Sequence, residues 1–421
     1  MKVIADLQIH SRFSRATSPS ITLPNLEKYA RLKGLNLLGT GDFTHPKWLA
    51  ELKNELKEDG SGILASKFGF NFVLQGEISN IYSQDGKPRR IHTLLLARNF
   101  EVVQQINEAL LKKGRLDYDG RPIFGFSCIE LVEMMKEIDD DIEIIPAHAW
   151  TPWYGIFGSM SGFDSVEECF KEQSKHIYAI ETGLSSDPSM NWRISKLDKY
   201  TLVSSSDAHS FWPWRLGREC NVFDMDLSYD NLLNAIRKRK GFVETIEFWP
   251  DEGKYHYSGH RLCNTSLSPK EALELKDICP QCRKKITVGV AERIEMLADR
   301  GQGFVPQNAV PFKNIIPLSE VICGTIGEKV ESKKVWEEYH RLINEFGNEF
   351  AVLLDADEKA LKKATSEKIA DNLIRNRNQK IPFKPGYDGV YGVPIFDDKE
   401  ESENKKEFVI NNKQKGLDEF L

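Results

Sequence analysis

Histidines and carboxylates at the ends of short apolar segments constrain the fold of this chain more than any other feature. The apolar segments, each typical of a β-strand, are residues 3–7, 35–40, 72–75, 90–97, 142–146 and 200–206. The polar side chains that end, follow or interrupt them are Asp6, His10, Asp42, Glu77, His92, His148, Asp207 and His209. Because barrel enzymes place their chemistry where strand ends meet at one rim, we expect these side chains to converge.

Imidazole mixed with carboxylate is a ligand set that suits Zn²⁺ and Mn²⁺. A single histidine in such a place is more often a core or surface residue than a ligand. Here, however, five of the nine histidines lie in or beside the strand-like segments, at positions 10, 45, 92, 148 and 209. This repetition predicts a multinuclear metal hydrolase, with all eight side chains named above as ligands.

Within this predicted centre we expect Glu77, Asp207 and His209 to be catalytic. Glu77 is the best candidate for a bridge, because a carboxylate can bind two metal ions at once. Glu181 ends a further strand-like segment, residues 177–182, and is either another ligand or an acceptor that orients a ligating imidazole. The residues favour zinc as the catalytic metal, with Mg²⁺ or Mn²⁺ as alternatives.

Residues 1–245 alternate strand-like segments with segments of helical periodicity, at residues 23–34, 127–138, 165–176 and 228–241. Such alternation favours the α/β class with a largely parallel sheet. Six or seven strand–helix units predict a distorted barrel rather than an open sheet. A chain of 421 residues is long enough for two or three domains. We therefore expect this barrel to end near residue 245 and smaller units to follow.

Residues 246–290 contain a second candidate metal site. Cys279 and Cys282 form a C-x-x-C pair, and His260 and Cys263 form an H-x-x-C pair before it, with His256 as an alternative histidine ligand. Paired ligands of this kind are typical of a closed, tetrahedral structural zinc site. The seven cysteines of the chain show no spacing typical of a secreted disulfide framework.

Residues 291–395 are expected to form a helical accessory region that contacts DNA. The net charge of −6 hides a basic cluster between residues 359 and 384, which includes Arg375, Arg377 and Lys380. A solvated helix face is the alternative explanation of this cluster. Tyr387 follows it and offers a face on which an unpaired base can stack. Arg193 and Arg215, which we expect at the same barrel rim, are further candidates for phosphate contact.

The end of the chain, residues 396–421, predicts a flexible tail that carries a docking motif. A charged segment precedes Gln414, Leu417, Phe420 and Leu421, which share one helical turn as a polar hook and an apolar plug. This pattern resembles the motif with which replication and repair enzymes bind the sliding clamp, with Leu421 in place of the usual second aromatic residue. The alternative is a short helix that packs on its own domain.

Residues 1–245 resemble the polymerase-and-histidinol-phosphatase (PHP) family of metal-dependent phosphoesterases. The motifs that carry the resemblance are DLQIHS, TGDFTH, GEIS, RIHTLLLA, PAHA and SDAH. The resemblance implies a trinuclear metal cluster on a distorted seven-stranded barrel. Two positions depart from the pattern, because Gln8 and Phe43 stand where this family commonly has histidines. His45 is the candidate for the missing ligand.

The PHP-like segment, the cysteine cluster, the KPGYDGVYG segment and the tail together resemble the endonuclease Q family of archaeal-type repair nucleases. The resemblance implies hydrolysis of the phosphodiester bond 5′ to uracil, hypoxanthine, xanthine or an abasic site. It also implies DNA and the sliding clamp as partners. The alternatives are a PHP phosphatase for a small phosphomonoester and a non-enzymatic DNA-binding scaffold.

No segment has the roughly 20 consecutive apolar residues that a membrane-spanning helix needs. We expect a cytoplasmic, nucleoid-associated protein without membrane contact.

Overall fold

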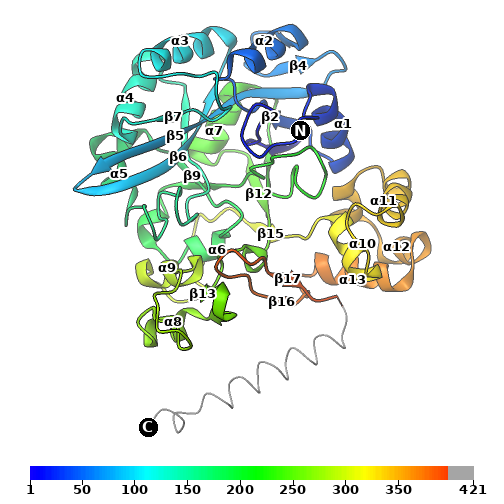
Figure 1. Cartoon of the computed structure of the whole chain (residues 1–421). Helices are drawn as coiled ribbons and strands as arrows, with labels where there is room; N and C mark the ends of the chain where they lie inside the picture. Colours follow the sequence, from blue (N-terminus) through cyan, green and yellow to red (C-terminus); the bar gives the residue numbers. More distant parts are fainter. Residues whose placement is uncertain (397–421) are drawn as a thin grey trace.

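The structure is a computed structural model that describes residues 1–396. A large sheet and the helices that cover it form one part of the molecule, and two smaller groups of elements lie below it (Figure 1). The strands are β1 (Lys2–Asp6), β2 (Leu37–Gly39), β3 (Leu56–Glu58), β4 (Leu64–Ser66), β5 (Asn71–Gln84), β6 (Lys87–Ala97), β7 (Ile123–Phe124), β8 (Glu143–Pro146), β9 (Ala179–Glu181), β10 (Thr201–Val203), β11 (Cys220–Asp224), β12 (Phe242–Glu247), β13 (Ser258–His260), β14 (Thr265–Leu267), β15 (Phe312–Asn314), β16 (Phe383–Lys384) and β17 (Val393–Pro394).

Thirteen α-helices lie within residues 1–396. They are α1 (Leu23–Lys33), α2 (Pro46–Glu55), α3 (Phe100–Leu111), α4 (Cys128–Ile138), α5 (Val166–Phe170), α6 (Pro188–Asn191), α7 (Tyr229–Lys238), α8 (Pro269–Glu274), α9 (Val290–Leu297), α10 (Leu318–Ile326), α11 (Lys333–Phe346), α12 (Glu358–Ala364) and α13 (Glu367–Arg377). Their ends follow local rules. At α1, for example, the side chain of Thr22 accepts a hydrogen bond from the Asn25 amide, and Gly34 ends the helix with a left-handed φ of 102°.

The α/β class is confirmed, but the main sheet is mixed rather than largely parallel. Strands β1, β2 and β5 pair in parallel. Strand β11, which has no counterpart among the predicted segments, pairs antiparallel with both β1 and β12, and β6 pairs antiparallel with β5 and β8. Strands β9 and β10 form a separate parallel pair, which a bridge between Ile9 and Ala208 connects to the chain after β1. The parallel neighbours bring the ends of β1, β2 and β5 to one side of the sheet.

Apolar side chains fill both sides of this sheet. One cluster on the β11–β12 side includes Val3, Leu37 and Phe223 together with the inner face of α7, from which Leu232 and Ile236 contribute. A larger cluster continues from the sheet through α1–α4 into α10–α13. The large part and the helical group therefore share one continuous apolar core.

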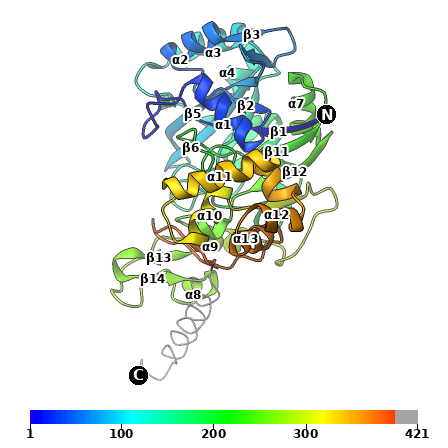
Figure 2. The same cartoon turned by 90° about the vertical axis from the view of Figure 1, so that its right-hand side faces the viewer.

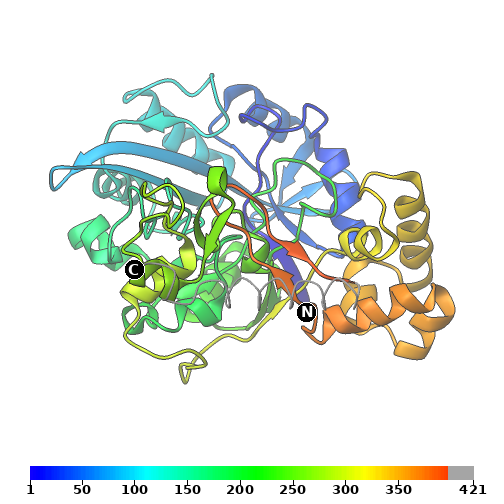
Figure 3. The same cartoon turned by 60° about the horizontal axis from the view of Figure 1, so that its bottom comes forward.

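The two smaller groups are connected to the large part at several points along the chain. Of the helical group, α11 lies nearest α1 (Figure 2), and β15 pairs in parallel with β12 at the edge of the main sheet. The β16–β17 hairpin returns to the segment around residues 250–257, where the Gly386 amide donates to the Asp251 carbonyl at 2.8 Å and the Tyr257 amide donates to the Gly386 carbonyl at 2.9 Å (Figure 3). The last described segment therefore ties the β13–β14 group to the large part.

No helix within residues 1–396 combines the length and the apolar character needed to cross a bilayer.

Candidate metal centre

Three of the predicted site residues have a left-handed backbone. Asp42, His148 and Asp207 have φ angles of 42°, 30° and 49°. Residues other than glycine rarely adopt this conformation, and each such position costs about 1–3 kcal/mol, which the surrounding structure must offset. Each of the three follows a strand closely, after β2, β8 and β10. The sharp turns that end these strands therefore direct polar side chains toward a common point.

The first group of candidate ligands consists of His10, Asp207 and His209, whose ligand atoms lie within 4.8 Å of one another. His10 Nε2 and Asp207 Oδ1 are 3.1 Å apart, and the rings of His10 and His209 have centroids 4.6 Å apart. His10 follows β1, while Asp207 and His209 follow β10. Two segments about 200 residues apart in the chain thus meet in one cluster.

The second group consists of Glu77, His92 and His148, with the same close spacing. Glu77 Oε1 lies 2.7 Å from His92 Nδ1 and 3.4 Å from His148 Nε2. The other carboxylate oxygen, Oε2, lies 3.0 Å from His10 Nε2 in the first group. Glu77 is fully buried on β5. Its two oxygens therefore face the two groups, which is the arrangement of a bridging carboxylate.

Unpaired buried atoms show that these residues fit divalent metal ions. His10 Nε2 and Asp207 Oδ1 are buried and form no hydrogen bond within residues 1–396, although they lie 3.1 Å apart. Buried polar atoms are normally hydrogen-bonded, so atoms that converge without bonding need another partner. Nitrogen and oxygen donors at this spacing are the ligands of zinc or manganese.

Asp6 and Asp42, predicted as ligands, belong to neither group. Asp6 accepts hydrogen bonds from the Ser206 amide at 3.0 Å, the Ser206 hydroxyl and the Gly217 amide at 2.9 Å, and burial raises its pKa to about 6. Asp42 lies 2.9 Å from His10 Nδ1 and accepts from the Ser11 amide at 2.6 Å. Both carboxylates are therefore already engaged by neighbouring groups, and Asp42 supports the candidate ligand His10 by fixing the orientation of its ring.

His45 and Glu181, the less certain predicted ligands, also lie outside the two groups. The His45 ring stacks on Phe13 with centroids 4.4 Å apart. Glu181 Oε2 accepts from the His148 amide at 2.6 Å, and burial raises the Glu181 pKa to about 8. Of the two roles considered for Glu181, its contact with the His148 backbone matches the supporting one.

Gln8 and Phe43 show how the chain accommodates the two missing histidines. Gln8 Nε2 donates a hydrogen bond of 2.9 Å to Glu77 Oε2, so its amide faces the carboxylate as a donor. Phe43 is fully buried, and its ring lies 3.1 Å from the position that a Cβ at Gly76 would occupy. Neither side chain adds a metal ligand to the two groups.

Arg121 enters the centre although nothing in the sequence singled it out. Its Nη1 lies 3.4 Å from Glu77 Oε1 and 3.5 Å from Oε2. The neighbouring Gly120 makes this possible, because a Cβ there would lie 2.2 Å from the Asp42 carboxylate. The sequence DYDGRP is typical of an ordinary turn. Only the close packing of Gly120 against Asp42 shows that this turn lies beside the candidate ligands.

The second predicted cluster lies in the β13–β14 group. His260, Cys263, Cys279 and Cys282 place their ligand atoms within 4.8 Å of one another, with His260 Nδ1 at 3.1 Å from the sulfur of Cys263 and 3.4 Å from that of Cys282. Burial raises the pKa of the Cys279 thiol, but amide donors from Cys282 and Gln281 outweigh burial and lower it to about 6. A low thiol pKa favours the thiolate, which is the metal-binding form. His256 lies outside this cluster and contacts Asp251 at 3.7 Å.

The predicted DNA-binding residues differ in how far they are already bonded. Arg377 donates to the carbonyls of Val352, Leu353 and Ala356, and the Tyr387 hydroxyl donates to Asn264 Oδ1 at 2.6 Å from a buried position. These two residues therefore have structural roles. Arg193 pairs with Glu295 at 2.8 Å, and Arg375 donates to Asn372 Oδ1 at 3.0 Å. Lys380 is exposed and Arg215 is half-buried. The predicted clamp-binding residues Gln414, Leu417, Phe420 and Leu421 lie outside the described residues.

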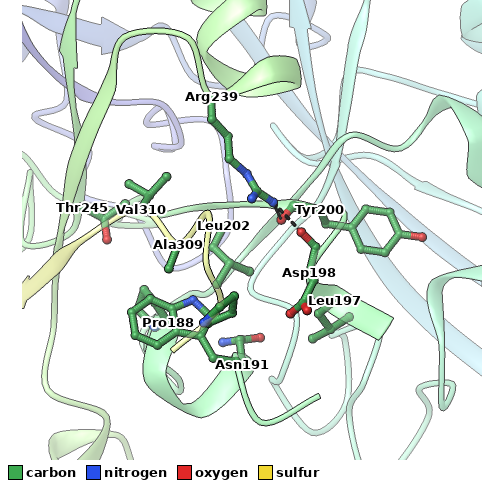
Figure 4. Close-up of a pocket in the computed structure, with 12 residues that line it drawn as sticks. Pro188, Asn191, Leu197, Asp198, Tyr200, Leu202, Arg239, Thr245, Ala309 and Val310 are labelled. Carbon is green, nitrogen blue, oxygen red and sulfur yellow. Dashed lines mark hydrogen bonds between the residues drawn. The ribbon is translucent and has the colours of Figure 1, made fainter. Parts of the chain in front are cut away.

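Two cavities lie away from the paired ligand groups. The smaller, about 30 Å³, borders β10 and Arg239, which donates to the carbonyls of Asp198 and Tyr200 (Figure 4). The larger, about 370 Å³, lies between α6, residues 249–251 and α9. Its walls include Trp249 Nε1 and His256 Nδ1, which have no hydrogen-bond partner within residues 1–396. The smaller cavity suits a few water molecules at most, whereas the larger is within the size range of small-molecule sites.

Comparisons with known proteins identify relatives of the chain. Residues 317–380 match the family model of the MJ0043 C-terminal domain. The uncharacterized protein MJ0043 of Methanocaldococcus jannaschii is 32% identical over 298 residues, which are 68% of this chain and 35% of that protein. The chain thus spans about a third of the length of this relative.

Two solved structures match almost the whole chain. The lesion-specific endonuclease PfuEndoQ from Pyrococcus furiosus is 33% identical, with a TM-score of 0.84 over 94% of this chain and 95% of that one. An endonuclease Q in complex with a 27-mer duplex that has an abasic lesion at the active site is 33% identical, with a TM-score of 0.85 over 95% of this chain and 98% of that one.

The fold, the paired ligand groups and these matches place the chain in a class of proteins that includes lesion-specific endonucleases. A relative 33% identical over nearly the full length of both chains is sufficient to assign the family. The chain belongs to the endonuclease Q family.

Proposed function

We propose that the chain is a DNA repair endonuclease that hydrolyses the phosphodiester bond 5′ to a deaminated base or an abasic site. The observation that carries this proposal is the pair of ligand groups joined by Glu77 in a chain that matches endonuclease Q over nearly its whole length. Uracil, hypoxanthine and xanthine are the deaminated bases in question. The metals proposed for the paired groups are zinc, manganese or magnesium.

Metal ions bound by the two groups would lower the pKa of a water molecule and stabilise charge on the leaving oxygen. The chain's own residues prepare this centre. Asp42 holds the His10 ring through Nδ1, which leaves Nε2 directed at Glu77 and Asp207. Glu181 accepts the His148 amide and stabilises the left-handed turn that presents the His148 ring. Such fixed orientation removes much of the reorganisation that catalysis would otherwise require.

The remaining parts of the molecule support a DNA substrate in this proposal. We infer that the β-strands around the centre act as the wall of a distorted barrel over residues 1–245. Residues 246–290 would form a structural zinc module, in which His260, Cys263, Cys279 and Cys282 would supply the four ligands. Residues 291–395, together with Arg193, Arg215, Arg375 and Lys380, contact the duplex. Residues 396–421 bind the sliding clamp, which would place the protein at the nucleoid.

The test is a nicking assay on duplexes that contain a single deoxyuridine, deoxyinosine or abasic site, with an unmodified duplex as the control. We expect one cut 5′ to the lesion, no cut in the unmodified duplex and no activity in EDTA. Release of phosphate from a small phosphomonoester, with every duplex left intact, would favour a phosphatase instead. Binding to lesion duplexes without cutting would favour a scaffold.

The variant Asp207→Asn tests the centre itself. Asparagine tolerates a left-handed φ better than most residues, so this change removes the charge without adding backbone strain at φ 49°. We expect loss of nicking and of metal bound at the first ligand group. Asp224→Asn is the matched control, because within residues 1–396 this exposed carboxylate pairs only with the chain's amino terminus. Nicking at the parent rate by Asp207→Asn would refute the assignment of the centre.

A further inference from the structure

We propose that Arg121 is a catalytic residue that binds the phosphate cleaved at this centre. The inference rests on the proposed endonuclease function and adds to it the group that holds the reacting phosphate. Arg121 follows Gly120 in the turn between α3 and β7. Its guanidinium is a fixed positive charge that lies within 4 Å of the Glu77 carboxylate.

The turn is built to hold Arg121 in this place. The Gly120 amide donates to the Phe13 carbonyl at 3.1 Å, and the Gly120 carbonyl accepts from the Thr44 hydroxyl at 3.0 Å. On the other side, the Pro122 carbonyl accepts from the Ser79 amide at 3.0 Å. Both neighbours of Arg121 are therefore fixed to segments that carry the candidate ligands, which places the Arg121 backbone beside the centre.

The side chain lies on the solvent side of the carboxylate. The Arg121 side chain is 22% exposed, whereas Glu77 is 0% exposed. Part of the Arg121 side chain is therefore accessible to a substrate phosphate, whereas Glu77 is not. Buried residues that only balance charge do not need this access.

Most donors of the guanidinium remain available. Only Nη1 approaches Glu77, at distances of 3.4 and 3.5 Å, and within residues 1–396 neither Nη2 nor Nε forms a hydrogen bond. An arginine has five N–H donors in a planar fork that matches two oxygens of a phosphate. The geometry therefore allows Arg121 to keep its contact with Glu77 and still bind a phosphate in a bidentate way.

Charge gives a second reason why Arg121 binds an anion. Its surrounding carboxylates are Glu77, Asp207, Asp119 and Asp42. Glu77 and Asp207 would give their charge to cations at the two groups, Asp42 is bonded to His10 and Ser11, and Asp119 contacts Arg15 at 3.2 Å. A guanidinium whose nearest carboxylates are occupied in this way has the substrate phosphate as its remaining anionic partner.

The experiment compares Arg121→Gln, Arg121→Ala and Arg115→Gln on a duplex with a stable abasic analogue. Arg115 lies in the same turn but is exposed and pairs with Asp117, so it is the matched control. We expect Arg121→Gln to lower kcat by roughly 10²–10³-fold, as for loss of one donor to a developing oxyanion, and to keep the metal content of the parent. Guanidinium ion added at millimolar concentration should partly restore Arg121→Ala, while Arg115→Gln should match the parent throughout.

The possible outcomes separate this inference from the proposed function. A parent protein that cuts no lesion duplex would refute the endonuclease function itself. A parent that cuts while Arg121→Gln cuts equally fast would overturn only the role of Arg121. Two other results would also overturn the role of Arg121. One is loss of metal from Arg121→Gln in proportion to its lost activity, and the other is an Arg121→Ala rate that guanidinium ion leaves unchanged. In either case Arg121 would support the ligands instead of binding the phosphate.

Discussion

Replacing Glu349 with glutamine should destabilise the contact between the helical group and α1 by about 3–5 kcal/mol, the range for breaking a buried ion pair. Lys33 on α1 donates from Nζ to Glu349 Oε1 at 2.7 Å and to the Pro213 carbonyl at 2.8 Å. The two side chains are 1% and 0% exposed. The glutamine would leave the Lys33 ammonium buried without an anionic partner, and this cost exceeds the worth of the pair itself.

The same carboxylate organises the helical group, because it also accepts from the Leu318 amide at 3.0 Å and from the Tyr339 hydroxyl at 2.9 Å. The change therefore disturbs the start of α10 and the middle of α11 as well as the contact with α1. Domains are stable by only about 5–15 kcal/mol. A loss of several kcal/mol should therefore be visible as an earlier unfolding transition of the helical group.

Urea unfolding followed by tryptophan fluorescence measures the effect, because Trp336 of α11 packs against Trp212 and Trp214 with ring centroids 5.5 and 5.6 Å apart. Glu337→Gln is the control, because the Lys333–Glu337 pair is 88% and 63% exposed and such pairs contribute about 0–1 kcal/mol. Adding Lys33→Met to Glu349→Gln should recover much of the loss. A change below about 1 kcal/mol for Glu349→Gln alone would refute the reasoning, since breaking a buried pair costs more than that.

Three further predictions concern other parts of the molecule. Cys279→Ala should release about one equivalent of zinc and expose the β13–β14 group to proteolysis, because structural zinc contributes on the order of 10 kcal/mol to small zinc-bound folds. Cys323→Ala is the control and should keep its zinc. Equal zinc content in both variants would contradict the assignment. Burial raises the pKa of Glu247 from 4.5 to about 8. Because the folded state then favours the protonated carboxyl, the protein should lose stability as the pH rises from 4.5 toward 8, and Glu247→Gln should flatten this dependence of Tm on pH. Parallel Tm profiles for the parent and the variant would show that Glu247 is not responsible. Deleting residues 414–421 should abolish binding to purified sliding clamp in calorimetry while nicking of short duplexes stays at the parent rate; unchanged affinity would exclude the tail as the docking site.

The sequence was sufficient to predict where the polar side chains gather but not what each one does there. His10, Glu77, His92, His148, Asp207 and His209 lie together because each ends or interrupts a strand of the predicted set. Asp6 has the same local pattern, yet its carboxylate is occupied by Ser206 and Gly217. Those partners lie about 200 residues away in sequence, so no local pattern distinguishes a ligand from the residue that supports it.

Long-range packing also explains the features that the sequence did not indicate. Strand β11 enters between β1 and β12 with antiparallel pairing, which strand–helix alternation does not predict. Arg121 reaches Glu77 only because Gly120 packs against Asp42. The cysteine cluster is the opposite case, because all its ligands lie within residues 260–282 and their spacing alone places them together. Short-range sites are therefore easier to predict than sites assembled from distant strands.

The return of the β16–β17 hairpin has a mechanical consequence. The β13–β14 group follows η3 (Pro250–Glu252), whose backbone bonds to Gly386 and Gly392 of the hairpin region. The same region also bonds to the group itself, where Asp388 accepts from the Arg261 amide at 2.8 Å. A module held by its own chain connection and also by a hairpin from elsewhere in the chain has less freedom to rotate than one held by a single connection. Under the proposed function, a contact between this module and a duplex would therefore lie at a set position relative to the paired ligand groups and would help to select the bond that is cut.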